Sequence, residues 1–336
     1  MPDLFVAADL VLMGTGFLVL NQGAKFLTDN AVVVAGRLGA SRFAVGALLV
    51  STLAALPEVL VSAFALKEGS PEIALSNALA SNVVTIAFVI GLSAIIMPIR
   101  TNRETVMRDA VFLATVTIVA SAILLDGNLS SLDGLALVAL FVPYTVNLVI
   151  AQRRGRPEDL AKAMDDIKLE LALTGALFGR RIEIRAGVRW LLFGIVWAVI
   201  GAQFIVFSAI QLSARLGISP WLVGLTAVAM GTSLPDIVAA YHATRRGYSD
   251  LALGEGIGAS VVTSLLTLGT MGLLLPSTFP VPQMVPVIAV MVVASLMLLA
   301  FLLGGWKLSR PAGLTLLALY FVMVALSLVA FANGAQ

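Results

Sequence analysis

The chain has 336 residues, of which 60% are hydrophobic and 12% are charged, and its formal net charge is +2. A soluble domain averages about half apolar and about a quarter charged residues, so this composition indicates a polytopic membrane protein. The sequence contains no cysteine and a single histidine, His242, which excludes disulfides, thiolate metal sites and histidine-based metal clusters.

Ten membrane spans are predicted from the apolar runs, because a hydrocarbon core about 30 Å thick requires roughly 20 apolar residues per helix. In chain order the spans cover residues 4–36, 43–66, 72–97, 107–125, 132–151, 187–214, 220–244, 250–275, 281–303 and 312–333. A polar, basic segment, 152–186, separates the fifth span from the sixth. The chain therefore divides into a first five-helix repeat (1–151), a cytoplasmic linker (152–186) and a second five-helix repeat (187–336).

The basic residues predict the orientation, because Lys and Arg near spans accumulate on the cytoplasmic side. With the N-terminus outside, the inner loops carry most of them, including Arg100 and Arg245, and the outer side keeps only Lys67 and Arg215. Both termini are thus expected outside a bacterial inner membrane. Five spans per half is an odd number, so the two halves cross in opposite directions, as in secondary transporters built from inverted repeats.

One stretch of the sequence occurs twice at a constant offset. Over residues 23–91, 21 of 69 positions are identical to the residue 178 positions later. Within it, Leu56-Pro57-Glu58 recurs as Leu234-Pro235-Asp236, and Val83-Val84-Thr85 recurs as Val261-Val262-Thr263. The sequence therefore predicts an all-α membrane protein of ten transmembrane helices, arranged as two inverted five-helix repeats.

Each copy carries an acid, Glu58 or Asp236, within a predicted span. An ionisable group at that depth is unfavourable unless it is paired, hydrated or bound to an ion. The preceding prolines have no N–H, so they free the carbonyls four residues earlier, which belong to Leu53 and Gly231. Carboxylates and free carbonyls are hard oxygen ligands suited to Na⁺ or Ca²⁺. We therefore expect a cation site at the midplane, where the halves meet.

The following span adds polar side chains at helical spacing. Asn77, Ser81 and Thr85 share one helix face, and their partners in the second copy are Glu255, Ala259 and Thr263. Thr85 and Thr263 are predicted to be ligands or to lie next to the ligands. Glu255 is a third acid within a span. It is either a proton-carrying or entry-path group, or the buried partner of a basic side chain.

Residues 223–236 and 254–260 resemble the α-repeat of the cation/Ca²⁺ exchanger superfamily, specifically its prokaryotic sodium/calcium exchanger branch, and residues 44–56 and 76–82 look like a diverged copy. The resemblance implies that Glu58 and Asp236 form the centre of the ion site, with ligands from Thr232, Ser233 and Ser81. Thr85 and Thr263 occupy positions where the family has Asn or Asp. Alanine stands at three implied ligand positions, 54, 55 and 259.

We therefore interpret the chain as a secondary antiporter, and not an enzyme, that exchanges Na⁺ against Ca²⁺ or a related divalent ion by alternating access. It is expected to need no cofactor beyond the transported cations, to bind no nucleic acid and to function as a monomer. Two alternatives remain: a proton-coupled cation exchanger, and a transport-inactive relative that acts as a membrane scaffold or sensor. An intramembrane hydrolase with paired acids is disfavoured, because inverted duplication suits transport better.

Overall fold

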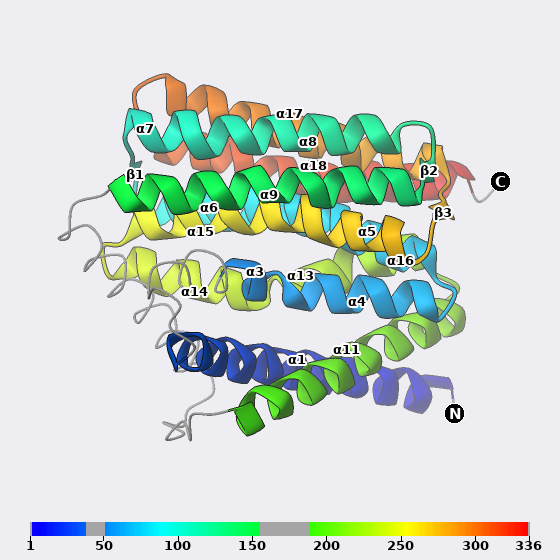
Figure 1. The fold of residues 1–336 in the computed structure, drawn as a ribbon. Helices are drawn as coiled ribbons and strands as arrows, with labels where there is room; N and C mark the ends of the chain where they lie inside the picture. Colours follow the sequence, from blue (N-terminus) through cyan, green and yellow to red (C-terminus); the bar gives the residue numbers. More distant parts are fainter. Residues whose placement is uncertain (1, 38–50, 155–187, 335–336) are drawn as a thin grey trace.

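The computed structural model describes residues 2–37, 51–154 and 188–334 (Figure 1). In the first half, the α- and π-helices are α1 (Pro2–Arg37), α3 (Ser51–Ala54), α4 (Leu56–Lys67), α5 (Pro71–Val83), η2 (Val84–Val89), α6 (Ile90–Ile96), α7 (Arg103–Thr105), η3 (Val106–Ala110), α8 (Val111–Leu124) and α9 (Ser131–Arg154). In the second half they are α11 (Val188–Leu216), α12 (Pro220–Val223), η4 (Gly224–Val228), α13 (Ala229–Thr232), α14 (Leu234–Arg245), α15 (Ser249–Val262), η5 (Thr263–Thr267), α16 (Leu268–Leu274), α17 (Val281–Leu303) and α18 (Arg310–Gly334).

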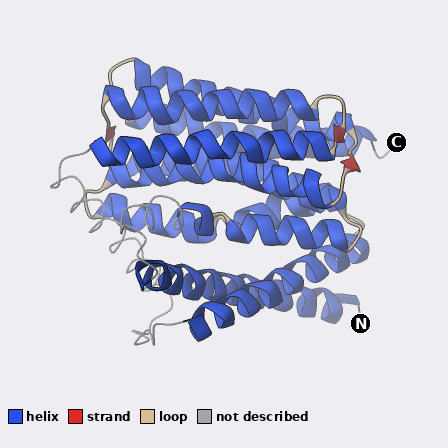
Figure 2. Ribbon diagram, viewed as in Figure 1, coloured by secondary structure: helices blue, strands red, loops and turns tan. Residues whose placement is uncertain are grey.

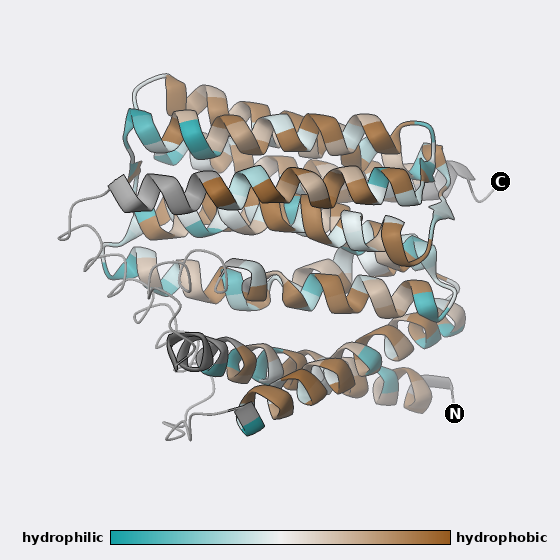
Figure 3. Ribbon diagram, viewed as in Figure 1, coloured by the Kyte–Doolittle hydropathy of each residue, from teal (hydrophilic) through white to brown (hydrophobic). Residues whose placement is uncertain are grey.

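The helices follow the predicted spans. Seven helical stretches in the described residues are long and apolar enough to cross a membrane, and the bent pair 220–232 with 234–245 makes an eighth. The apolar stretch of α9 that covers residues 131–146 is shorter than these. The first part of the predicted second span, 43–50, lies outside the described residues. Apolar residues cover the middle of the long helices, and hydrophilic residues gather at their ends (Figure 3). The chain is therefore an all-helical, multi-pass membrane protein.

The repeat of the sequence is also a repeat of structure. The helices α3, α4 and α6 begin and end 178 residues before α13, α14 and α16. Four two-residue strands, β1 (Ile99–Arg100), β2 (Asn128–Leu129), β3 (Ser277–Thr278) and β4 (Lys307–Leu308), complete the described elements (Figure 2). β1 pairs with β4 and β2 with β3, both antiparallel, at opposite ends of the molecule. Each strand pair thus joins one half to the other.

Helix contacts also cross between the halves. Gly134 of α9 lies so close to α16 that a Cβ there would meet the oxygen of Gly269 at 2.6 Å. At the equivalent place, a Cβ on Gly313 of α18 would meet the oxygen of Gly91 in α6 at 2.6 Å. Because each half places its last helix against a helix of the other half, the two repeats form one packed unit.

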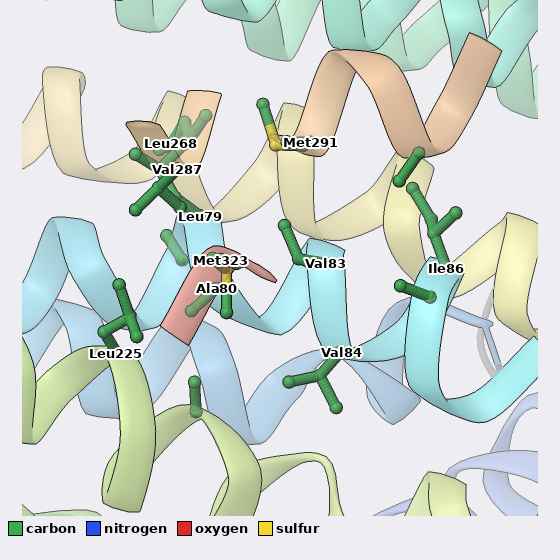
Figure 4. Packing of buried hydrophobic residues seen from close by; sticks show 14 of the residues in the cluster. Leu79, Ala80, Val83, Val84, Ile86, Leu225, Leu268, Val287, Met291 and Met323 are labelled. Carbon is green, nitrogen blue, oxygen red and sulfur yellow. The ribbon is translucent and has the colours of Figure 1, made fainter. Parts of the chain in front are cut away.

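The third span of each half lies at the centre of that unit. Within an apolar stretch of 18 residues, 78% of the residues are buried in 71–96 and 72% in 249–274, whereas 22% are buried in residues 4–27 of α1. Figure 4 shows side chains of α5 and η2 packed against those of other elements. The labelled residues are Leu79, Ala80, Val83, Val84, Ile86, Leu225, Leu268, Val287, Met291 and Met323. Polar residues on α5 and α15 are therefore held within a dense apolar framework.

The helices α1 and α11 cross one another in a separate layer, at the bottom of Figure 1. A Cβ on Gly23 would lie 2.3 Å from the Ala198 nitrogen, and one on Gly201 would lie 2.3 Å from the Leu20 nitrogen, so only glycine fits at this crossing. Arg215 Nε lies 3.1 Å from Asp9 Oδ2, which ties the N-terminal part of α1 to the last turn of α11. With 36 residues, α1 is about 54 Å long, so it exceeds a single span.

Candidate cation-binding site

Two broken helices position the predicted acids. The first break lies at Ala55, between α3 and α4, and the second lies at Ser233, between α13 and α14, where the helix bends by 43°. Pro57 and Pro235 are each the second residue of the helix that follows, where a missing N–H costs little. Glu58 and Asp236 therefore stand in the first turn of α4 and α14. The partial positive charge of a helix N-terminus favours a carboxylate there.

Four buried side chains from three helices meet around Thr232. Its Oγ1 lies 3.5 Å from Ser81 Oγ, 3.4 Å from Asn77 Oδ1 and 3.2 Å from the Ala229 oxygen of its own helix, and its hydroxyl faces the carboxylate of Glu58. Thr232 ends α13 in the second half, whereas Glu58, Asn77 and Ser81 belong to the first. The structure thus brings three of the predicted site residues, Glu58, Thr232 and Ser81, together across the boundary between the repeats.

Asn77 and Ser62 complete this cluster and were not among the predicted ligands. Asn77 Nδ2 donates to Ser62 Oγ at 3.0 Å and to the Glu58 backbone oxygen at 3.5 Å. Ser62 Oγ in turn donates to the Ala74 oxygen at 3.0 Å. Ser62 follows Glu58 by four residues, so helical spacing alone could have placed it on the acid's face. Asn77 links α5 to both α4 and α13, which makes it the connecting residue of the cluster.

Two buried oxygens of the site have no hydrogen-bond partner among the described residues. They are Glu58 Oε2 and Ser233 Oγ, and their side chains are 3% and 0% exposed. Buried polar atoms are normally hydrogen bonded, so an orphaned carboxylate oxygen requires an explanation. Carboxylate, hydroxyl and amide oxygens are the hard ligands that Na⁺ and Ca²⁺ take. The donor set therefore fits a transported cation.

The other predicted site residues lie on equivalent elements of the two halves. Thr85 and Thr263 are buried in the π-helical turns η2 and η5, and the Ile90 N–H bonds five residues back to the Thr85 oxygen. Such wide turns occur often at functional sites. Leu53 and Gly231 lie just before the breaks, and a Cβ on Gly231 would meet the ring of Phe17 of α1.

Asp236 is partly buried, and its part in ion binding stays a prediction, as do those of Ser233, Thr85, Thr263, Leu53 and Gly231. Among the described residues, no group of three or more acidic or histidine side chains is close enough to hold a metal ion. A site in this part of the chain therefore relies on one or two carboxylates together with neutral oxygens.

Comparison with known proteins also indicates a membrane protein that transports cations. The family model of the sodium/calcium exchanger protein matches residues 9–150 and 187–329. The chain is 30% identical to the putative antiporter CaxA of Alkalimonas amylolytica, over 91% of this chain and 93% of that protein. It is 29% identical to the inner membrane protein YrbG of Escherichia coli K12, over 79% of this chain and 79% of that protein. It is 27% identical to the sodium/calcium exchanger MaX1 of Methanosarcina acetivorans, over 93% of this chain and 95% of that protein.

Solved structures agree with this comparison over nearly the whole chain. The sodium-calcium exchanger NCX_Mj, soaked with Na⁺ and Sr²⁺, superposes with a TM-score of 0.63 and 26% identity, covering 95% of this chain and 99% of that one. The same exchanger soaked with Na⁺ and Ca²⁺ gives a TM-score of 0.61. The predicted architecture of ten transmembrane helices in two inverted repeats is thereby confirmed. The chain belongs to the sodium/calcium exchanger family of membrane cation antiporters.

Proposed function

We propose that this protein is a secondary antiporter that exchanges Na⁺ against Ca²⁺ or a related divalent cation across the bacterial inner membrane, by alternating access. One observation carries the proposal: Glu58 is buried at a helix break, is contacted by Thr232 of the opposite half, and keeps one carboxylate oxygen without a partner among the described residues. Relatives described as a sodium/calcium exchanger and as an inner membrane protein support the ions and the location.

The proposed ion site joins both halves at the midplane. Glu58 and Asp236 bind the cations, and further oxygens come from the side chains of Thr232, Ser233, Ser81, Thr85 and Thr263 and from the carbonyls of Leu53 and Gly231. Ions of both kinds compete for the same carboxylates, so one must leave before the other binds. Because Thr232 bonds to α5 across the repeat boundary, ion binding acts on the contact that relates the two halves.

The proposed organisation follows the charge pattern and the duplication. The repeats 1–151 and 187–336 are joined by a cytoplasmic linker, 152–186, and both termini lie outside. The described chain places α1 and α18 so that both termini emerge at the same end of the molecule (Figure 1), which an even number of spans requires. We propose that a single chain contains the complete transport path, so the monomer is the functional unit.

Exchange by purified protein in proteoliposomes tests the function. Replacement of the charged ligand, Glu58→Gln or Asp236→Asn, is expected to lower Na⁺-driven Ca²⁺ flux by at least about 100-fold, because about 2.7 kcal/mol of ion stabilisation is lost. Glu68→Gln is the matched control: Glu68 is an exposed acid at the end of α4 that accepts a bond from Gln203 at 3.1 Å, so flux should be unchanged. Undiminished flux in both ligand variants would refute the proposed site.

Proton-coupled exchange is the second candidate, and the orphaned Glu58 oxygen favours it too, because a proton satisfies a buried carboxylate as well as a metal ion does. Cation flux that follows a pH gradient and ignores Na⁺ would select this mechanism. Wild-type protein that binds no cation at all would instead indicate a transport-inactive relative acting as a membrane scaffold or sensor.

A further inference from the structure

Three buried polar atoms from three helices line one small cavity that lies outside the candidate cation site. They are Trp221 Nε1 in α12, Gln283 Oε1 in α17 and Ser327 Oγ in α18, and none has a hydrogen-bond partner among the described residues. Trp221 and Ser327 are 2% and 3% exposed. The cavity is lined by Ser219, Trp221, Leu222, Gln283, Ser327 and Ala330. Buried polar atoms are normally hydrogen bonded, so three of them at one cavity indicate a partner that the described side chains do not supply.

The start of the broken helix in the second half fixes the position of the Trp221 indole. Ser219 Oγ accepts the Trp221 backbone N–H at 3.2 Å, and Pro220 begins α12. This helix continues without interruption through η4 and α13 to Thr232, in the cluster around Glu58. The other two polar atoms belong to α17 and α18, which pack against each other (Figure 1). The cavity therefore lies between one end of the helix that supplies Thr232 and this pair of helices.

The size and the chemistry of the cavity select its occupant. Its volume is about 10 Å³, which is close to the room that one water molecule needs. An indole N–H can only donate, an amide oxygen can only accept, and a hydroxyl does both. Water meets these demands together, because it carries two protons and two lone pairs. An ion is unsuitable, because none of the described residues that line the cavity is charged, and the indole hydrogen would repel a cation.

We propose that one water molecule occupies this cavity and bridges Trp221, Gln283 and Ser327. The Trp221 Nε1–H donates to the water oxygen, the water donates to Gln283 Oε1, and the Ser327 hydroxyl takes the remaining proton or lone pair of the water. A bridge through an ordered water is nearly as favourable in enthalpy as a direct hydrogen bond. The water thereby anchors the end of the broken helix that lies far from Ser233 to α17 and α18. This water site does not depend on the proposed exchange function, because none of the three residues belongs to the cation site.

The NMR signal of the Trp221 Nε1–H in purified, ¹⁵N-labelled protein tests for the water. This proton should show a rotating-frame Overhauser contact with water, of the sign that distinguishes a close contact from proton exchange. Trp221→Phe identifies the signal, because the chain has four tryptophans. A contact with another protein side chain in place of water, or no contact at all, would overturn the proposal.

Ser327→Val tests the anchoring role, because its methyl groups fill the cavity and displace the water. The contact between Trp221 and water should disappear. The backbone amides of residues 221–228 should exchange with deuterium at least about fivefold faster, because Trp221 and Gln283 each lose a hydrogen bond. Ser327→Ala removes the same hydroxyl but leaves room for the water, so the contact with Trp221 should remain.

The control is a second buried serine on α17. Ser295 Oγ donates to the Val292 oxygen at 2.9 Å within its own helix, so Ser295→Ala should change neither the water contact nor the exchange of residues 221–228. Unchanged exchange in folded Ser327→Val protein would overturn the anchoring role. If the Ser327→Val protein does not fold, the water contact in wild-type and Ser327→Ala protein still decides whether the water is there.

Discussion

Thr232 shows how a single side chain joins the two repeats. Its hydroxyl faces Ser81, Asn77, the carboxylate of Glu58 and the Ala229 oxygen of its own helix, but it has only one proton to donate. At any moment its lone pairs are therefore available to other partners, and rotation about one bond redirects the proton. A hydroxyl in this position can give up a contact with protein and turn an oxygen lone pair to a cation without movement of the helix.

Removal of this hydroxyl should weaken cation binding more than stability. Thr232→Ala is expected to raise the half-saturating Ca²⁺ concentration for exchange about tenfold, because one charge-assisted contact is worth about 1.5–3 kcal/mol. Thr232→Ser, which keeps the hydroxyl, should stay near the wild-type value. Concentration dependence of flux in proteoliposomes gives the measurement.

The matched control for this substitution lies on the same broken helix. Thr226 donates to the Leu222 oxygen at 2.6 Å, within its own helical segment, so Thr226→Ala should leave the ion dependence unchanged. Equal half-saturation in Thr232→Ala and wild-type protein would remove Thr232 from the site.

The sequence singles out four of the proposed site residues by itself. Glu58 and Asp236 stand out because they are acids within apolar runs at one offset, and Ser81 and Thr232 stand out through the family motif. Asn77 and Ser62 acquire their roles from hydrogen bonds between helices, and the sequence does not state which helix faces join.

The close crossing of helices α1 and α11 depends on glycine. The α1–α11 pair approaches so closely at Gly201 that an added methyl group would overlap the backbone of Leu20. Small residues at such crossings allow close backbone approach in lipid, where the hydrophobic effect does not drive helix association. Helix propensity alone would favour alanine over glycine by about 1 kcal/mol, so packing has to outweigh it here.

Alanine at this crossing should therefore destabilise the protein. Gly201→Ala is expected to cost about 1–3 kcal/mol through overpacking and to lower the melting temperature. In contrast, Gly14→Ala in α1 should be neutral or slightly stabilising, because its Cβ would meet no described atom within 4 Å. Thermal unfolding followed by the fluorescence of Trp190 and Trp197 in α11 reports on the change. Equal melting temperatures for the two variants would contradict the close-packing argument.

Elements differ in how well a sequence reveals them. Long apolar runs predicted the helices, and prolines predicted both breaks. The four strands were not predicted, because two residues each are too short for any periodic pattern, and their partners lie in the other half. The π-helical turns were missed for a related reason: they add one residue to a turn without changing the apolar character of the helix.

At the scale of the whole molecule, the two strand pairs mark opposite ends of the spans. β1 with β4 closes one end and β2 with β3 closes the other (Figure 1). The proposed orientation places Arg100 of β1 in the cytoplasm and Asn128 of β2 outside. Both side chains are exposed, and the chain has no cysteine of its own, so single cysteines introduced at these positions report on one site each.

Labelling with a membrane-impermeant maleimide tests this orientation. The Asn128→Cys protein should react in intact spheroplasts, and the Arg100→Cys protein should react only in inside-out vesicles. Both should react after the membrane is permeabilised, and the cysteine-free parent should not react at all. The reverse labelling pattern would show that the protein crosses the membrane in the opposite orientation, and it would leave the inverted repeats unaffected.

The crosswise packing of the halves has a consequence for biosynthesis. Helix α6 reaches its native surroundings only when α18 lies against Gly91, and β1 finds its partner only in β4, near the end of the chain. During translation the first half therefore enters the bilayer before the second, and the surface of α6 that later contacts α18 is not yet covered by that helix. Asn77 and Ser81 remain without Thr232 for the same interval, so the ion pathway cannot assemble until the ribosome has delivered the second half.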